Sequence, residues 1–355
     1  MDAKNNKIAI IICYYGKLPE YTSAFLYSCE KNSDIDWLIF SDCDTSTFNI
    51  PVNVHFIYMP MSEIKLRMEK IVGFEVSLDR GYKLCDYRVA YGLIFQDYLK
   101  TYDFWGHCDL DVIWGDLRKY ITSELTSKYD KIYMMGHLSL IRNSEECNKV
   151  FMLETRDTVS YRKVFTDNKS YYFDEMDYNK KFVQSGLRVY EKIDCVDRAD
   201  IYHNRVLSVG KKEMQGAYPN TFMTCLEFPK NHLFQIFTYE SGKIYREYMK
   251  KWKIYREEYA YMHFRCKLTV PDYNLAQSQK YFITSDRMVP AFGKTTMLNI
   301  IKLNFPSIVK ERKQYNDYLI HQHQKESMVT CIKYCLYRIR ILRKIVKSIK
   351  NRRKM

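Results

Sequence analysis

The sequence lacks any long hydrophobic run. A helix needs about 20 apolar residues in succession to span a bilayer, and no segment of the 355 residues approaches this length. A polar start is followed by an apolar run at residues 8–15, which is too short for the core of a signal peptide with its cleavage site. We therefore expect a first β-strand there, in a chain that does not cross a membrane.

Paired cysteines, internal repeats and low-complexity linkers are also missing. The eleven cysteines are an odd number with no C-x-x-C pair, so they form neither a zinc pattern nor a disulfide framework. Reduced thiols in the cytoplasm fit this usage best. With 46% hydrophobic and 28% charged residues, the chain has the composition of a globular protein with one large domain and a smaller extension, or with two domains.

Positive charge is abundant, but most of it lies at one end. The formal net charge is +14, and residues 331–355 hold ten Lys or Arg and no acidic residue, which leaves +4 for the rest. A protein that bound nucleic acid through its folded body would need a basic surface there. The mildly basic body and the lack of a nucleic-acid recognition motif therefore argue against that class.

The first part of the chain alternates between strand and helix patterns. Apolar runs predict strands at 8–14, 37–41, 54–59, 131–135 and 138–142, and amphipathic spacing predicts helices at 21–30, 62–72, 85–100 and 144–154. Further on, Ser241-Gly242 joins 232–239 to 243–248 in an expected hairpin. The alternation predicts an α/β sheet, with ligands at the carboxyl ends of its strands.

Two aspartates stand in the middle of an apolar stretch. Residues 104–115 read FWGHCDLDVIWG, so Asp109 and Asp111 are one residue apart. Buried carboxylates need a partner, and in a continuous strand both would point to one side while Leu110 points into the core. Two hard oxygen ligands suit Mg²⁺ or Mn²⁺, which keep positions open for the phosphates of a nucleoside diphosphate.

An Asp-x-Asp triplet is weak evidence by itself, because chance predicts about 1.5 among 23 aspartates and three occur. The triplet at 34–36 precedes a strand and is most simply a solvated turn, whereas 42–44 follows a strand. Only Asp109 and Asp111 have apolar aromatic sequence on both sides. A satisfied helix or turn cap is the structural alternative for them.

A longer motif carries a family resemblance. Residues 82–92 read YKLCDYRVAYG, and residues 102–111 read YDFWGHCDLD after an expected helix. Together they resemble a family of bacterial glycosyltransferase-like proteins of capsule and lipopolysaccharide biosynthesis clusters, similar to nucleotide-sugar transferases of the GT-A fold. The resemblance covers residues 7–267. It implies a Rossmann-like mixed sheet flanked by helices, with Asp111 on the metal and Asp109 on the metal or the donor ribose.

The same resemblance implies a third metal ligand. Enzymes of the GT-A fold often bring a late histidine to the metal, and His263, in an apolar and aromatic segment, is the best candidate. A hydrogen-bonded core histidine is the alternative.

Further nucleotide contacts are implied by where a nucleotide lies in this fold. They are Tyr14, Tyr15, Gly16, Asp42, Lys83 and Asp86. The loop after the first strand would wrap the base by aromatic stacking, with Asp42 close by at the end of the next strand, although ordinary packing also explains tyrosines in a chain that has 32 of them. Lys83 and Asp86 would contact the diphosphate and the ribose or base, and for Asp86 a solvated cap is the alternative.

Two segments are candidates for the reacting sugars. An inverting transfer needs a carboxylate base near the acceptor, and Asp174 and Glu175 follow an aromatic patch. Acids also occur at a helix start merely because of the helix dipole. In the expected strand at 138–142 and its ends, the resemblance makes His137, Arg142 and Asn143 sugar contacts.

The tail carries an apolar stripe at spacings of three and four, formed by Ile332, Leu336, Ile339, Leu342, Val346 and Ile349. The resulting basic amphipathic helix suits an anionic bilayer surface, with about 1 kcal/mol per cation; a helix docked on its own protein is the alternative. We expect a transferase domain at 1–270, a helical extension at 271–330 and this tail at 331–355, and a cytoplasmic protein peripheral to the inner face of the membrane.

These patterns predict a metal-dependent glycosyltransferase that moves a sugar from a nucleotide donor to a glycan or lipid-linked acceptor in cell-surface polysaccharide synthesis, without nucleic acid as a partner. Two alternatives stay open. One is a non-catalytic protein that binds nucleic acid through its cationic tail. The other is a degenerate transferase fold that binds nucleotide sugars without turning them over. The donor, the acceptor and the stereochemical outcome do not follow from the sequence.

Overall fold

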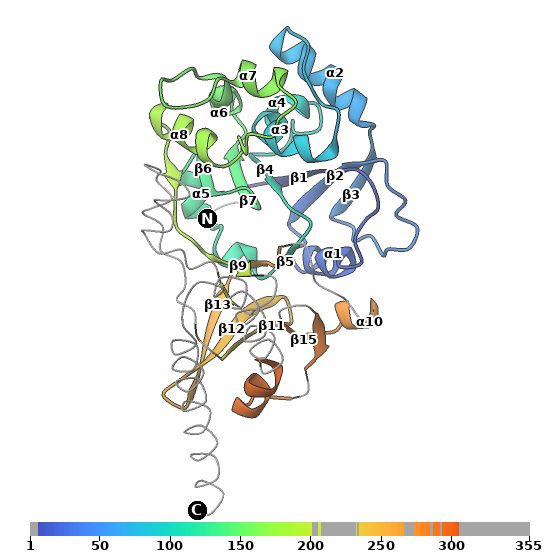
Figure 1. The fold of residues 1–355 in the computed structure, drawn as a ribbon, viewed down its shortest axis with the longest axis vertical. Helices are drawn as coiled ribbons and strands as arrows, with labels where there is room; N and C mark the ends of the chain where they lie inside the picture. The colour runs from blue at the N-terminus through green and yellow to red at the C-terminus, as the bar shows by residue number, and fades with distance from the viewer. Residues whose placement is uncertain are drawn as a thin grey trace, which may run out of the picture. The chain divides into compact units, whose positions relative to one another are not determined.

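The computed structural model describes residues 6–200, 205–206, 232, 234–265, 273–284, 287–291 and 293–304 (Figure 1). These residues belong to one compact unit that ends at Asn304. It contains a seven-stranded sheet, a four-stranded sheet and a five-stranded sheet. The predicted tail at 331–355 lies outside the described residues, and the predicted division of the chain at residue 270 stays a prediction.

The seven-stranded sheet is mixed, with the order β3-β2-β1-β4-β7-β6-β8. Its strands are β1 (Ile8–Tyr14), β2 (Ile35–Ser41), β3 (Val54–Tyr58), β4 (Phe104–Cys108), β6 (Lys131–Met135), β7 (Leu138–Arg142) and β8 (Val189–Tyr190). The first four strands are parallel to one another, whereas β7 runs antiparallel to both β4 and β6. The carboxyl ends of β1, β2 and β4 therefore meet at one edge, where an open α/β sheet binds its ligands.

Helices cover both faces of this sheet, because the strands are apolar on both sides (Figure 1). The α-helices of this part are α1 (Thr22–Glu30), α2 (Met61–Val72), α3 (Leu84–Tyr87), α4 (Tyr91–Ile94), α5 (Ser123–Lys128), α6 (Glu145–Lys149), α7 (Tyr161–Thr166) and α8 (Met176–Gln184). Alternate residues of β1 serve two cores: Ala9 and Ile11 pack toward α2 and α4, and Ile8 and Ile10 toward α1. This arrangement confirms the expected α/β class.

Most predicted elements are present within one or two residues, but the expected helix at 85–100 is broken. It forms α3, a 3-10 turn at Arg88–Ala90 and α4, after which the chain turns before Lys100. The backbone leaves helical values at Ala90 and again at Phe95. From residue 85 to residue 95 no residue is exposed, so the apolar spacing there does not mark one buried and one exposed face as in an amphipathic helix. The expected helix at 144–154 is likewise shorter, as α6 followed by a 3-10 turn at Val150–Met152.

The strand expected to run through Asp109 and Asp111 is interrupted there. Strand β4 ends at Cys108, residues 109–111 form a bend, and β5 (Val112–Trp114) begins a different sheet. The bend arises because β4 pairs with β1 and β7, whereas β5 pairs with β14 (Tyr261–His263). Leu110 still points into the core, with 5% of its surface exposed. The positions of the two carboxylates are therefore set by the bend after β4, and not by the alternation of side chains along a continuous strand.

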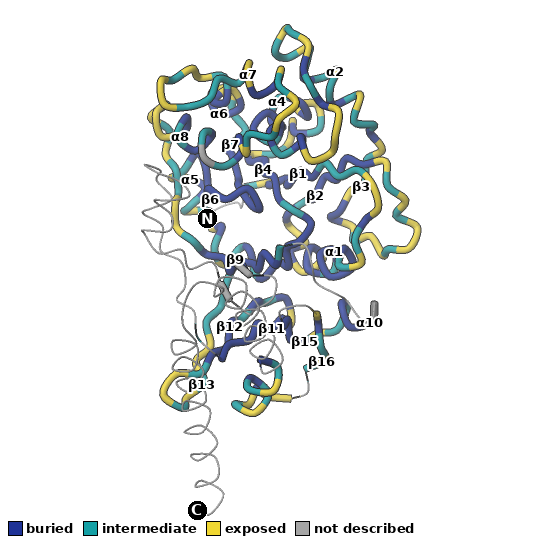
Figure 2. The backbone as a smooth tube through the Cα atoms, in the orientation of Figure 1, coloured by how far each residue is buried: buried dark blue, intermediate teal, exposed yellow. Residues whose placement is uncertain are grey.

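Two small sheets complete the described part. The four-stranded sheet joins β5 and β14 to β9 (Cys195–Asp200) and β10 (Arg205–Val206), and the five-stranded sheet contains β11 (Gln235–Glu240), β12 (Lys243–Lys250), β13 (Lys253–Tyr259), β15 (Lys280–Ile283) and β16 (Met288–Pro290). The predicted hairpin is β11 and β12, and Gly242 has the expected positive φ of 79°. A short helix, α10 (Tyr273–Ala276), precedes β15. No helix in the described ranges has the length and apolarity needed to cross a membrane. Figure 2 shows that the central strands of the seven-stranded sheet, such as β1 and β4, are buried, whereas β13 at the edge of the five-stranded sheet is partly exposed.

Candidate metal and nucleotide site

A cavity of about 710 Å³ opens at the carboxyl ends of β1 and β4, a size typical of small-ligand sites. Five segments far apart in sequence line it, together with two late residues. They are the end of β1, the broken segment at 81–91, the bend at 108–111, the turn at 135–137, the loop at 172–175, and His263 and Arg265; Tyr21 also lines the cavity. The cavity therefore lies where the fold predicts a ligand.

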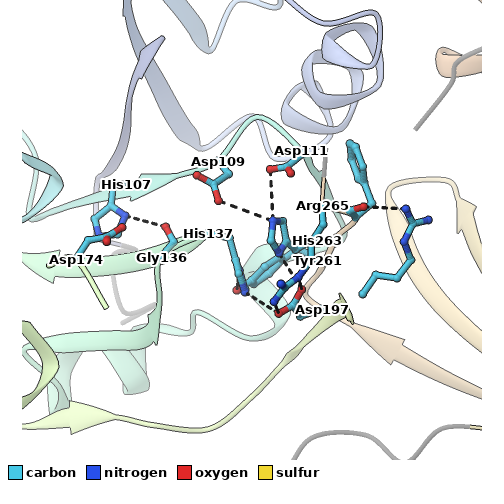
Figure 3. Close-up of polar contacts among 12 residues, drawn as sticks. His107, Asp109, Asp111, Gly136, His137, Asp174, Asp197, Tyr261, His263 and Arg265 are labelled. Atoms are coloured by element: carbon cyan, nitrogen blue, oxygen red, sulfur yellow. Dashed lines mark hydrogen bonds and ion pairs between the residues drawn. The ribbon is translucent and has the colours of Figure 1, made fainter. Parts of the chain in front are cut away.

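Asp109, Asp111 and His263 converge on the wall of this cavity (Figure 3). The Nε2 atom of His263 lies 3.4 Å from Oδ1 of Asp111 and 3.8 Å from Oδ2 of Asp109. The pairing of β14 with β5 sets His263 opposite Val112, the residue after the bend. A strand from late in the chain thus completes a group that the Asp-x-Asp triplet begins.

A buried carboxylate orients the imidazole of His263. Its Nδ1 atom bonds to Oδ1 of Asp197 on β9 at 2.9 Å, and Arg265 binds both oxygens of Asp197 at 2.9 and 2.8 Å. Burial raises the pKa of Asp197, but its bonds to Arg265 and His263 outweigh burial and hold that pKa well below the usual range. Asp197 therefore stays ionised and keeps the proton on Nδ1 of His263, so that Nε2 is the atom that faces Asp109 and Asp111.

The three groups fit a divalent cation. One ligand atom from each of Asp109, Asp111 and His263 lies within 4.8 Å of the others, and two carboxylates with one imidazole suit Mn²⁺ or Mg²⁺. A carboxylate behind the ligating histidine is the usual support of such sites. Burial lowers the pKa of His263, yet its bonds to Asp111 and Asp197 and their charges raise it to about 10. These carboxylates therefore favour a positive charge at this point, which either a proton or a metal ion can supply.

A second group, formed by His137, Asp197 and His263, also has metal-ligand spacing. His137 stacks on His263 with ring centroids 4.3 Å apart, and its Nδ1 lies 3.0 Å from the Tyr261 hydroxyl. Burial lowers the pKa of His137 to about 3, so this ring is neutral. Because both oxygens of Asp197 already bind Arg265 and one also binds His263, the first group offers the better metal site.

Arg88 joins the metal side of the cavity to the opposite wall. Its guanidinium pairs with Oδ1 of Asp109 and, through Nη1, lies 3.0 Å from both Oδ2 of Asp174 and the carbonyl of Gly136. Burial raises the pKa of Asp174 to about 7 although Arg88 lowers it, and burial also raises the pKa of the neighbouring Glu175. Two acids with raised pKa values therefore face the cavity.

The turn between β6 and β7 brings these acids close to the backbone. A Cβ atom on Gly136 would stand 2.9 Å from Oε1 of Glu175 and 3.0 Å from Oδ2 of Asp174, so no larger residue fits without moving them. The buried ring of His107 contacts the same carbonyl of Gly136 at 3.1 Å (Figure 3). This close packing fixes the wall that carries the two acids.

The sequence did not identify Arg88, His107, Gly136 or Asp197 as parts of the site. Arg88 and His107 lie inside the two motif segments, so the motifs contained a signal for them. Asp197 lies in a polar, tyrosine-rich region without a recognisable pattern, and only the pairing of β14 with β9 brings it behind His263.

Lys83 and Asp86 lie away from the predicted nucleotide position. Both side chains are fully buried and pair with each other at 2.9 Å. Lys83 also bonds to the carbonyls of Val164 and Lys169, while the carboxylate of Asp86 accepts from the backbone of Tyr171 and Phe173. They do not line the cavity. The solvated-cap alternative for Asp86 is also wrong, because the pair tethers the loop before Asp174 from within the core.

Arg142 and Asn143 likewise have structural partners outside the cavity. Arg142 pairs with Asp130 at 3.0 Å and binds two backbone carbonyls, and Asn143 donates to the carbonyls of Leu99 and Tyr102. Because these bonds point the two side chains away from the cavity lining, the expected sugar contacts do not form there. Of the three candidates in this segment, only His137 lies on the cavity wall.

The loop after β1 lies partly at the cavity. Tyr14 and Tyr15 line it, and their hydroxyls donate to the carbonyls of Lys17 and Met59 at 3.1 and 2.7 Å. Gly16, which follows Tyr15 with a positive φ of 106°, and Asp42, which follows β2, are exposed and are not part of the lining. Tyr14 and Tyr15 therefore lie on the cavity wall, and their stacking on a base stays a prediction.

Comparison with known proteins shows the family of the chain. Residues 10–291 match a family described as a family of unknown function, DUF6625. The chain belongs to this family. The chain is also similar to a galactosyltransferase, LgtC, solved with donor and acceptor sugar analogs, at 11% identity and a TM-score of 0.31 over 54% of this chain and 75% of that one. The similarity to a solved active-site mutant of LgtC has 10% identity and a TM-score of 0.31, over 54% of this chain and 74% of that one. No curated protein matches. Values this low carry no argument about activity.

Proposed function

We propose that this protein is a metal-dependent glycosyltransferase of GT-A type that uses a nucleoside diphosphate sugar. The observation that carries the proposal is the convergence of Asp109, Asp111 and His263 on one cavity at the carboxyl edge of an α/β sheet. A Mn²⁺ or Mg²⁺ ion held there would stabilise the charge of a departing diphosphate. The motifs at residues 82–92 and 102–111, which resemble polysaccharide transferases, support the same function.

Residues of the chain divide the work between two sides of the cavity. On the donor side, the rings of Tyr14 and Tyr15 would stack on the base, and Arg88 would orient Asp109. On the other side, Asp174 and Glu175 stand as candidate catalytic acids. With a pKa of about 7, Asp174 exchanges its proton near neutral pH, which suits a general base that takes a proton from an acceptor hydroxyl. Whether the anomeric centre inverts or retains stays open.

Two exposed tyrosines mark the acceptor side of the mouth. Tyr82 and Tyr172 line the cavity, are more than half exposed, and place their rings 6.4 Å apart at 81°. Flat aromatic faces next to an opening suit a sugar ring, whose C–H faces are apolar. We propose a glycan or lipid-linked acceptor of cell-surface polysaccharide synthesis. The enzyme would be cytoplasmic and peripheral to the inner face of the membrane through residues 331–355.

The first test measures ligand-dependent stability. With Mn²⁺ or Mg²⁺ present, a nucleoside diphosphate should raise the thermal midpoint of the wild type, since a ligand that binds only the folded state stabilises it. Asp111→Asn should abolish this rise. Asp44→Asn is the matched control, because Asp44 belongs to an exposed Asp-x-Asp triplet outside the cavity. No rise with any nucleoside diphosphate, or an unchanged rise in Asp111→Asn, would refute the proposal.

A donor screen then separates the two binding alternatives. Hydrolysis of one nucleotide sugar that requires Asp111 supports an active transferase, whereas binding without turnover of any donor would identify a degenerate transferase fold. Salt-sensitive binding to random DNA, lost on deletion of residues 331–355, would support the non-catalytic nucleic-acid alternative.

A further inference from the structure

The tip of the hairpin formed by β12 and β13 concentrates positive charge around one tryptophan. Lys250 and Lys253 are cross-strand partners, and Lys251 and Trp252 form the two-residue turn between them. All three lysines are exposed and Trp252 is half-buried. Figure 2 shows this end of the hairpin as exposed. Within the described ranges, none of the three ammonium groups has an ion-pair partner.

The turn holds these residues in a strained backbone conformation. Lys251 and Trp252 have φ values of 49° and 61°, the left-handed region that a two-residue hairpin turn of this hand requires. Asn-Gly is the usual sequence there, and large side chains are disfavoured. The turn at the other end of β12 also requires positive φ values, and there one of the two positions is a glycine, Gly242. Strain kept at an exposed position indicates a role for these two side chains outside folding.

Behind the charged tip lie apolar and aromatic rungs. Met249 pairs with Ile254, and both are partly exposed. Tyr248 pairs with Tyr255, and their rings stack 5.5 Å apart at 13°. The two acids of β13 have other cationic partners, because Glu257 lies 3.6 Å from Arg246 and Glu258 lies 2.7 Å from Lys119. The end of the hairpin is therefore basic, with apolar surface directly behind the charge.

We propose that this hairpin tip docks on the surface of an anionic lipid bilayer. Trp252 would lie at the level of the headgroups, where tryptophan is favoured. The lysines would place their ammonium groups among lipid phosphates while their stems cover apolar surface. A nucleic acid would pair with the lysines but gain little from the aliphatic rung of Met249 and Ile254, so the bilayer is the better fit. This docking does not depend on the proposed transferase activity.

The first experiment uses the fluorescence of one tryptophan. The chain has four, and Trp37, Trp105 and Trp114 are fully buried, which leaves Trp252 as the one that a lipid can reach. The full-length protein is mixed with equimolar phosphatidylglycerol and phosphatidylcholine vesicles whose acyl chains carry bromine. We expect part of the emission to be quenched, and Trp252→Phe to lose this quenching while its circular dichroism spectrum is unchanged.

The second experiment separates local from overall charge. In the tip variant, Lys250, Lys251 and Lys253 are changed to Glu. In the control, Lys70, Lys100 and Lys163, which are exposed outside this hairpin, are changed to Glu, so both variants have the same net charge. We expect the tip variant to bind the vesicles about tenfold more weakly than the control, because cations close to the membrane surface dominate this attraction.

Three results would overturn the proposal. They are vesicle binding without quenching of wild-type emission, equal weakening by the tip and control variants, and an absence of vesicle binding. Weakened binding of single-stranded DNA in the tip variant, with vesicle binding and quenching unchanged, would assign the tip to a nucleic acid instead.

Discussion

At the residue scale, Asp197 shows how much of a metal site can lie outside its ligands. It contacts no proposed ligand except His263, yet its hydrogen bond to Nδ1 selects the tautomer that offers Nε2 to the cavity. Arg265 in turn keeps Asp197 ionised. The orientation of the imidazole therefore depends on a carboxylate far from any recognisable motif.

Asp197→Asn is expected to weaken Mn²⁺ binding by about 10- to 100-fold, the usual effect of removing the carboxylate behind a ligating histidine. The measurement is isothermal titration calorimetry of the metal alone. Asp194→Asn is the control, because Asp194 is also buried but bonds to Tyr133 and Lys192 instead. Equal affinities in the two variants would contradict the role given to Asp197.

Lys131 is a buried cation whose titration should appear in stability. Its ammonium donates to the carbonyl of Tyr133 and to Ser139, and burial lowers its pKa from 10.5 to about 7. Between these values the unfolded chain binds a proton that the folded chain does not, so the contribution of Lys131 to stability rises as the pH rises from 7 to 10. Below pH 7 the folded protein must bury the charge.

We expect Lys131→Met to remove this dependence. Relative to the variant, the wild type should gain about 2–4 kcal/mol of unfolding free energy between pH 7 and pH 10. Urea unfolding at several pH values measures the difference, and the exposed Lys100→Met should leave the wild-type slope intact. A constant difference between wild type and Lys131→Met would show that the lysine titrates normally.

At the element scale, regular strands were predictable from the sequence and the functional bend was not. The runs at 8–14, 131–135 and 138–142 coincide with β1, β6 and β7 because buried strands require continuous apolar sequence. Asp109 and Asp111 were placed on one side by assuming a continuous strand. They do share a side, but through a bend that depends on the pairing of β5 with β14, a contact across the whole sequence that local periodicity does not encode.

The same distinction explains the candidate site residues. The cavity is lined by five of the predicted residues: Asp109, Asp111, His263, Asp174 and Glu175. They could be predicted because acids and histidine are unusual within apolar sequence. Lys83 and Asp86 have equally unusual positions, but they satisfy each other inside the core. A lysine and an aspartate three residues apart have the same sequence pattern whether they bind a ligand or pair with each other. The sequence alone does not separate these cases.

The buried Lys83 and Asp86 pair tethers the loop before Asp174 to the 81–87 segment. Lys83→Met should lower the unfolding free energy by about 3–5 kcal/mol, because it leaves an uncompensated carboxylate in the core. Chemical denaturation measures this loss. A stable Lys83→Met protein that fails to bind a nucleoside diphosphate would instead restore the predicted diphosphate contact.

At the scale of the whole molecule, the distribution of charge should govern association with membranes. The proposed tail at 331–355 and the hairpin tip at 250–253 are both basic, while the rest is only mildly so. Raising the salt from 0.1 M to 1 M shortens the Debye length from about 10 Å to 3 Å, so release from anionic vesicles is expected over this range.

Deletion of residues 331–355 provides the companion prediction. Without its ten cations the protein should leave phosphatidylglycerol vesicles at a lower salt concentration than the full chain, as followed by co-sedimentation. Unchanged co-sedimentation of the truncated protein would refute the membrane role of the tail and leave the hairpin tip as the contact to be tested.

The pairing of β14 with β5 has a consequence for the order in which the chain folds and binds its metal during synthesis. A cation shared by Asp109, Asp111 and His263 would act as a staple that closes a loop of about 150 residues, and such long-range closure favours the folded chain most. During synthesis the two aspartates leave the ribosome long before the histidine. A nascent chain that stops short of β14 would therefore lack the third ligand and the sheet partner that holds the bend in place, so capture of the metal would be among the last events in maturation.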